Sequence, residues 1–241
     1  MGLVIFNNRS SKDYYAEIES PPWYKTPARD YELTHVPGRN GDLLYDQGSY
    51  QNLDVTYTMS VVPPEGYTYA ETMLKFQSWL HSGSGYCRLE DSYDPEHYRL
   101  ACFKDESEID NYFEKAGRVN VTFHCKPGRF LKDGEEPILM DEATKVIINK
   151  TEQNARPFFM IAGSGTGEFT VNNYTVTISE IENGMIIDCD LMDCYKDNTN
   201  LNNRVSISPV DDFPVFIPGR NVMTFSGGIE ALVIIPRWWS L

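Results

Sequence analysis

Regular alternation of apolar and polar residues marks two stretches of the chain as half-buried strands. The first runs from residue 53 to 61, and its apolar positions are Leu53, Val55, Tyr57, Met59 and Val61. The second runs from residue 117 to 126, with apolar residues at 119, 121, 123 and 125. A period of two is typical of a strand with one face on a core and the other in water. We predict two long strands here, the second ended by Pro127-Gly128.

A helical pattern interrupts the strands once. Thr68 and Glu71 have the spacing of a capping box, in which each side chain bonds to the other residue's amide. Apolar residues then follow at steps of three and four, up to Leu80. The sequence therefore predicts one amphipathic helix within an otherwise β-rich region.

The second half of the chain shows strand patterns throughout. About seven short apolar runs follow one another, and Asn172-Asn173 has the chemistry of a two-residue hairpin turn. The glycine-rich residues 163–167 lack the Gly-Lys-Ser/Thr ending of a nucleotide-binding loop, so we interpret them as a connection between strands. This spacing of strands without helices is typical of a β-sandwich.

A charged break at residues 131–137, with one glycine and one proline, separates these two regions. We therefore predict two domains, residues 1–132 and residues 133–241. The predicted fold class is mainly β, with a β-barrel domain and one flanking helix followed by a β-sandwich.

Composition narrows the classes of function. A formal net charge of −14 disfavours a protein that grips nucleic acid, because phosphates are held by clustered lysine and arginine. The chain has no apolar run of the roughly 20 residues that span a bilayer, and its start lacks the pattern of a signal peptide. We expect no membrane anchor, and a protein made in the cytoplasm. Five cysteines without paired spacing are expected to be free, buried thiols.

No local pattern indicates catalysis, a metal or a cofactor. The four histidines lie far apart, and Cys189 and Cys194, although flanked by aspartates, fit neither a zinc nor a calcium spacing. Adjacent acidic pairs such as Glu90-Asp91 point to opposite sides of a strand. We expect no catalytic, metal or cofactor-binding residues, although distant carboxylates can converge in a way that spacing does not show.

Several segments together resemble the distal tail proteins of long-tailed, non-contractile bacteriophages. They are GRNGD at 38–42 with Gly48 and Tyr50, then residues 88–101, FHCKPGRF at 123–130, RP at 156–157 with GSG at 163–165, IDCD at 187–190, FP at 213–214 with PGRN at 218–221, and PRWW at 236–239. Each segment is weak evidence alone, being a turn or a strand end. Together they run in order along nearly the whole chain.

The resemblance implies a tail-tube-like first domain that closes into a ring of six, and a galectin-like second domain. It implies a structural hub at the virion's tail tip, which joins the tail tube protein to the tail-associated protein and anchors receptor-binding proteins. DNA would pass through the central channel, which an acidic lining would not retain. A neighbouring copy could cover the edge of the long strand at 53–61.

Two predictions concern particular residues. We expect the loop at 38–42 and the tyrosines after it to contact a neighbouring subunit, through Arg39, Asn40, Asp42, Tyr45 and Tyr50.

The alternative function is a carbohydrate-binding module, in which Phe169, Tyr174 and Tyr195 would stack on sugar rings. A cell-wall-degrading enzyme is a third class, for which the chain carries no local signature.

Overall fold

The computed structural model describes residues 2–104, 108–113, 116–209 and 212–241, without the side chains of residues 108–113. The chain forms two compact units, Met1–Arg129 with Leu241, and Phe130–Ser240. The sequence-based boundary falls at residues 132 and 133. Whether either unit folds independently stays a prediction.

The first unit is a curled sheet with one helix. Its elements are β1 (Val4–Phe6), β2 (Arg9–Ser10), a 3-10 turn (Ser11–Tyr14), β3 (Ala16–Ile18), β4 (Arg29–Thr34), β5 (Leu43–Tyr50), β6 (Leu53–Val61), α1 (Tyr69–Leu80), β7 (Cys87–Asp91), β8 (His97–Phe103), β9 (Glu108–Phe113) and β10 (Ala116–Leu131). The sheet order is β2-β1-β7-β8-β10-β6-β3, and β9 also pairs with β10. A bridge between Gly2, just before β1, and Ile18 of β3 brings the two sides of this order together, in keeping with the barrel-like curl of the sheet.

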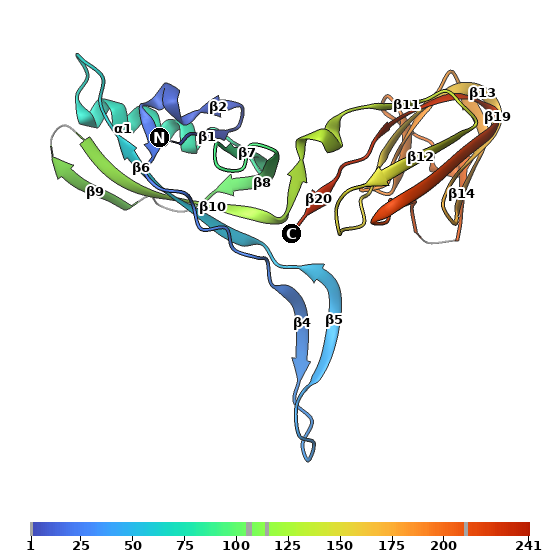
Figure 1. Ribbon diagram of the computed structural model, residues 1–241, viewed down its shortest axis with the longest axis horizontal. Coiled ribbons are helices and arrows are strands. Elements are labelled where there is room, and N and C mark those ends of the chain that lie inside the picture. The colour runs from blue at the N-terminus through green and yellow to red at the C-terminus, as the bar shows by residue number, and fades with distance from the viewer. Residues whose placement is uncertain (1, 105–107, 114–115, 210–211) are drawn as a thin grey trace. The chain divides into compact units, whose positions relative to one another are not determined.

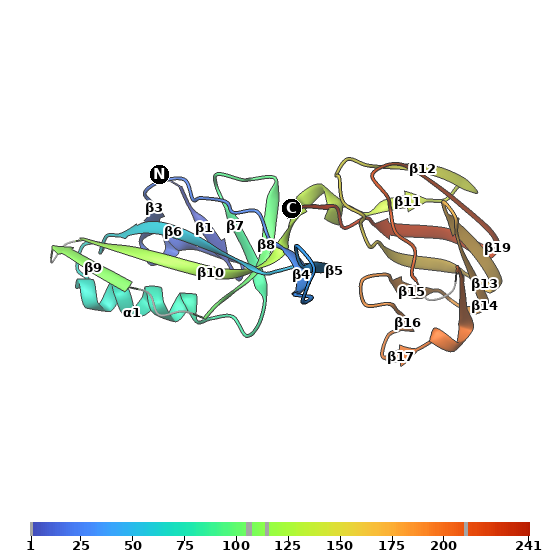
Figure 2. The same ribbon diagram turned by 90° about the horizontal axis from the view of Figure 1, so that it is seen from below.

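The two strands predicted from alternation form the centre of this sheet. β6 and β10 pair antiparallel from Leu53 with Cys125 to Val61 with Gly117. Their apolar face lies in the core with Phe6, Phe76 and Trp79, and Figure 2 shows α1 alongside β10. The capping box is confirmed, since Glu71 N donates to Thr68 Oγ1 and Thr68 N donates to Glu71 Oε2.

One prediction about the sheet was wrong. β10 does not end at Pro127-Gly128 but continues to Leu131. Its pairing with β6 ends at Cys125, so the missing amide of Pro127 costs no bond to that strand. β10 covers one side of β6 from Leu53 to Val61, whereas β3 covers the other side only from Met59 to Val61. That a neighbouring copy covers the rest of the second side stays a prediction.

The second unit is a β-sandwich, as predicted. Its elements are a 3-10 turn (Lys132–Glu135), β11 (Ile138–Met140), β12 (Thr144–Asn149), β13 (Phe158–Val171), β14 (Tyr174–Glu182), β15 (Met185–Asp188), β16 (Asp193–Lys196), β17 (Thr199–Asn200), a 3-10 turn (Asn202–Arg204), β18 (Val205–Ser208), β19 (Gly219–Ile235) and β20 (Trp239–Ser240). The sheet order is β11-β19-β13-β15-β16-β17, with β12 on β19 and β14 between β13 and β18. The core contains Phe159, Phe169, Phe216 and Trp238.

The glycine-rich residues 163–167 are not a connection between strands, but an irregular stretch inside β13. The register between β13 and β19 shifts there. A Cβ on Gly163 would lie 2.0 Å from the carbonyl oxygen of Gly228, and a Cβ on Gly228 would lie 1.9 Å from that of Ser164. Glycine is required because the two backbones approach too closely for any side chain. The Asn172-Asn173 turn is confirmed, with Val171 opposite Tyr174 and Asn172 at φ 54°.

Candidate assembly surface

A two-stranded hairpin of β4 and β5 extends away from the sheet of the first unit (Figure 1). We call residues 29–50 the arm. Glu32 pairs with Tyr45, Leu33 with Leu44 and Thr34 with Leu43. β4 was not predicted from the sequence, although Tyr31 and Leu33 alternate with charged residues. Gly48 lies within β5 at φ 77°.

The arm carries exposed apolar side chains on both faces. Tyr31, Leu33 and their cross-strand neighbour Leu44 share one face, while Leu43 and Tyr45 lie on the other. Leu33 is 61% exposed and Tyr45 is 65% exposed. An isolated two-stranded hairpin is marginally stable in water, and clustered apolar residues on a surface mark a contact site. The arm is therefore the candidate assembly surface of the first unit.

A polar clamp fixes the base of the arm. Arg29 Nη2 lies 2.8 Å from Asp46 Oδ2, and Arg29 Nε donates to Asp46 Oδ1 at 3.0 Å. The same guanidinium covers the ring of Tyr50 at 4.7 Å. Hydrogen bonds from Arg29, together with one from the amide of Gly48, lower the pKa of Asp46. These contacts join β4 to β5 at the base of the arm.

The predicted interface residues are distributed along the arm. Arg39, Asn40 and Asp42 lie in the exposed loop at its tip, and Asp42 Oδ1 is 3.2 Å from His35 Nδ1. Within the described part of the chain, the Arg39 side chain has no polar partner. Tyr45 stands free on β5, whereas Tyr50 is half-buried against Arg29 at the base. The five predicted interface residues thus all lie on the arm, and their contact with a neighbouring copy stays a prediction.

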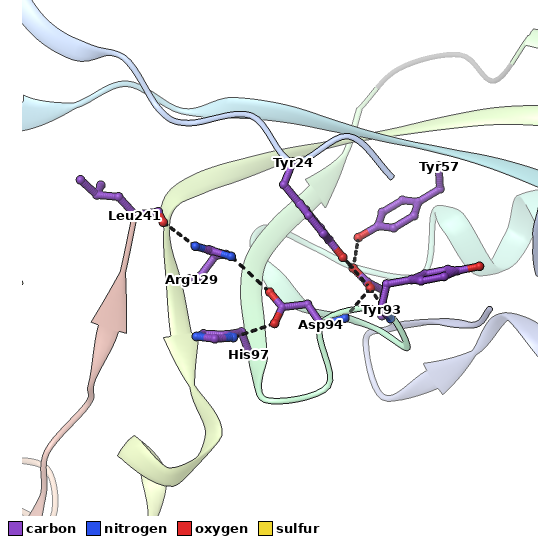
Figure 3. Close-up of polar contacts among 8 residues, drawn as sticks. Tyr24, Tyr57, Tyr93, Asp94, His97, Arg129 and Leu241 are labelled. Carbon is purple, nitrogen blue, oxygen red and sulfur yellow. Dashed lines mark hydrogen bonds and ion pairs between the residues drawn. The ribbon is translucent and has the colours of Figure 1, made fainter. Parts of the chain in front are cut away.

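A second polar cluster, shown in Figure 3, fastens residues 20–28 to the sheet. The Asp91 carboxylate accepts hydrogen bonds from the hydroxyls of Tyr24, at 2.7 Å, and Tyr57, at 2.8 Å. Burial and the adjacent Asp91 charge raise the pKa of Tyr57 well above its usual value, and the pKa of Tyr24 is raised for the same reasons. Both phenols therefore stay protonated and act as permanent donors.

The same cluster continues toward the end of the chain. Asp94 contacts His97 Nδ1 at 2.7 Å and Arg129 Nη1 at 3.5 Å. Arg129 Nη2 donates to the carbonyl oxygen of Leu241 at 2.7 Å. The sequence signal for these contacts is slight, because their residues are spread over more than 200 positions.

Residues 5–125, half of the chain, match the family model described as the phage tail protein RIFT-related domain. The chain belongs to this family of phage tail proteins. The resemblance drawn from the sequence motifs is thereby confirmed, and membership places the protein in the tail of a virion. No curated protein sequence matches the chain.

Solved structures share the fold of this tail protein over its whole length. The crystal structure of the Dit protein of bacteriophage SPP1 matches with a TM-score of 0.74 at 9% identity, covering 100% of both chains. It is described as a paradigm of the hub adsorption apparatus in phages that infect Gram-positive hosts. A chain of the phage p2 baseplate in its activated, calcium-bound conformation matches with a TM-score of 0.54 at 11% identity, covering 98% of this chain and 97% of that one. The same baseplate with strontium gives a TM-score of 0.51 at 10% identity, covering 97% of each chain. The predicted barrel-like and galectin-like architecture agrees with these folds.

Of the three aromatic residues proposed for sugar stacking, one is fully buried and two are half-buried. Phe169 is completely buried and packs on Phe159 with ring centroids 5.1 Å apart. Tyr174 is half-buried, with its hydroxyl 3.4 Å from Asp212 Oδ2, and Tyr195 is half-buried opposite Ile186. The suggestion that Phe169 binds sugar was wrong, because alternation places it on the inner face of β13.

The described residues also show little that could carry chemistry. Among residues 2–104, 108–113, 116–209 and 212–241, no three His, Cys, Asp or Glu side chains group as metal ligands. Cys125, Cys189 and Cys194 are buried thiols, and burial raises the pKa of each. Such thiols are poor nucleophiles at neutral pH. Within the same residues, no helix is long and apolar enough to cross a membrane.

Proposed function

We propose that this tail protein is the structural hub of the tail tip, a ring of six copies that joins the tail tube to the tail-associated protein and to the host-recognition apparatus. The observation that carries this proposal is the likeness of fold to SPP1 Dit over the full length of both chains. Membership of the phage tail family supports it independently. The family model matches residues of the first unit, whereas the likeness of fold to SPP1 Dit covers both units.

The arm supplies subunit contacts in this proposal. Its leucines and tyrosines are exposed to water. A neighbouring copy that covers them would remove this apolar surface from water, which favours association. At its tip, Arg39 reaches a carboxylate of the neighbour, because a guanidinium binds carboxylates with two parallel hydrogen bonds. Asn40, Asp42, Tyr45 and Tyr50 complete the contact. A hairpin with two apolar faces can touch more than one neighbouring surface.

The outer face of β6 and β10 suits the wall of a DNA channel. Thr56 Oγ1 bonds Thr122 Oγ1 at 2.8 Å, and Thr58 Oγ1 donates to Asn120 Oδ1 at 2.9 Å. The cation of Arg118 is neutralised by Glu19 at 3.0 Å. Hydroxyl and amide groups that bond each other give phosphates little to bind, so DNA would slide past this face.

The solution mass of the purified full-length protein tests the ring. We expect light scattering to give six times the 27.6 kDa of one chain, with a central opening visible in negative-stain images. Native mass spectrometry of the same sample would fix the copy number. A monomer across all concentrations and salt conditions, also in the presence of the tail tube protein, would contradict the proposal.

A further inference from the structure

Trp23 is 89% exposed in a segment that is anchored at three other residues. Residues 20–28, which we call the strap, run without regular secondary structure between β3 and β4. Pro22 and Pro27 are buried, and the hydroxyl of Tyr24 is bound by Asp91. Trp23 lies between the buried Pro22 and the anchored Tyr24, and its own side chain is directed into solvent. The strap therefore presents an indole ring at little further cost in entropy.

A hollow with a largely apolar wall lies elsewhere on the same unit. Its volume is about 470 Å³, within the roughly 300 to 1,000 Å³ of pockets that hold drug-sized molecules, so an indole ring fits. It lies beside the paired ends of β3 and β6. The residues that line it are Lys12, Tyr15, Ala16, Glu17, Ser60 and Val62. We call it the Tyr15 pocket.

The backbone at Tyr15 is strained in a way that shapes this pocket. Tyr15 has φ 59° and ψ 31°, a left-handed conformation that bulky residues rarely adopt. Two hydrogen bonds hold it there, from Tyr15 N to Lys12 O at 3.1 Å and from Val62 N to Tyr15 O at 3.0 Å. Strained residues held by their surroundings cluster at binding sites. The Tyr15 ring also lies 6.3 Å from that of Tyr67, which continues the aromatic surface.

We infer that Trp23 of one copy inserts into the Tyr15 pocket of the next copy around the ring. The inference rests on the proposed ring assembly and names a contact that holds it together. Trp23 and the pocket are different surfaces of one chain, and a contact between different surfaces is the kind that repeats around a closed ring. In the pocket, the indole packs on Tyr15 and Val62, and the Lys12 ammonium can lie over its face.

The chemistry of the pocket favours a side chain over a small polar ligand. Lys12 and Glu17 are its charged residues, and they carry opposite charges that offer no net attraction to an anion or a cation. The other lining residues are Tyr15 and Val62, which expose a ring and methyl groups, Ser60 with its hydroxyl, and Ala16, whose side chain lies in the core. Tryptophan is among the residues most enriched at the centres of protein interfaces, where partners exclude water.

Substitutions on the two sides of the contact test it separately. Trp23→Ala and Val62→Glu should each raise the concentration at half assembly by at least about tenfold. Trp23→Phe should assemble within about threefold of wild type, because a ring still fills the pocket. Leu74→Ala, at a 65% exposed residue of α1, is the matched control and should have no effect. Each altered residue is exposed, and circular dichroism will verify that the fold is kept.

Cross-linking identifies which surfaces meet. Mixing Trp23→Cys protein with Val62→Cys protein under mild oxidation should give covalent dimers, whereas either variant alone should give no more than wild type. Trp23 fluorescence should shift to the blue on assembly, and Trp23→Phe should abolish that shift. If wild type forms rings that Trp23→Ala leaves unchanged, or if no mixed dimers form, this inference is wrong while the ring stands. If wild type forms no rings, both proposals fail together.

Discussion

Arg237 and Asp188 form a bidentate ion pair in the second unit, with Nη1 to Oδ1 at 2.6 Å and Nη2 to Oδ2 at 2.9 Å. Asp188 is 3% exposed, and its Oδ1 also accepts from the amides of Asp190 and Leu191. Burial alone would raise the pKa of Asp188, but the Arg237 guanidinium and the two amides outweigh burial and lower it. The pair joins the end of β15 to the chain segment after β19.

The first prediction is that this pair makes the second unit sensitive to acid. A carboxyl whose folded pKa is lowered stabilises the fold fully above its unfolded value of about 3.9, and this contribution is lost as the pH falls through the folded pKa. Asp188→Asn should therefore cost about 1 to 3 kcal/mol at pH 7, and the difference from wild type should shrink below about pH 4. Urea unfolding followed by fluorescence at several pH values measures this. Glu152→Gln, at an exposed residue of the same unit, is the control, and an equal loss there would refute a specific role for the pair.

The second prediction concerns Arg39 at the tip of the arm. Arg39→Ala should leave the monomer folded and weaken each subunit contact by on the order of 2 kcal/mol, because it removes an arginine anchor from the interface. Sedimentation velocity over a range of concentrations measures the effect. Arg9→Ala, also at an exposed arginine of the first unit, should assemble as wild type. Unchanged assembly of Arg39→Ala would show that the tip is an ordinary solvated loop.

The third prediction concerns the acceptor that Tyr24 and Tyr57 share. Asp91→Ala leaves the buried hydroxyl of Tyr57 without its partner, which should cost the first unit about 1 to 3 kcal/mol. The strap should also loosen, so that protease cleaves the chain near Lys25 faster than in wild type. Tyr24→Phe should loosen the strap while leaving Tyr57 bonded, and should therefore cost less stability. Equal melting temperatures for Asp91→Ala and wild type would be incompatible with this role.

The fourth prediction concerns the domain boundary. The amide of Leu131 donates to the carbonyl oxygen of Trp238 at 2.9 Å. The amide of Arg237 donates to the carbonyl oxygen of Gly134 at 2.8 Å. A fragment that begins at Phe130 keeps both bonds, whereas one that begins at Glu136 loses both. We expect the longer fragment to unfold cooperatively on its own and to be more stable by about 1 to 3 kcal/mol. Thermal unfolding compares them, and a longer fragment without a cooperative transition would mean that the two units share one core.

The exposed residues of the arm show the limit of inference from sequence. Loop chemistry at residues 38–42 indicated a turn, and the structure has an exposed loop there. The hairpin around that loop was not predicted, because Leu43, Leu44 and Tyr45 of β5 are consecutive apolar residues and give no one-sided pattern. A strand exposed on both faces has no alternation to detect. Its pairing is decided by the partner strand and by the clamp of Arg29 on Asp46.

The sequence by itself determined the elements whose causes are local. Alternation placed β6 and β10 correctly, and the Thr68 and Glu71 side chains placed the start of α1. Only the tertiary structure decided that β10 continues past Pro127 and that residues 163–167 stay within β13. Both outcomes depend on the neighbouring strand. β6 has no residue paired with Pro127, so the missing amide breaks no bond to β6, and Gly163 lies against the backbone of Gly228 in β19. A residue's own propensity is local, whereas the cost of a lost bond or a close approach depends on the strand that the fold places beside it.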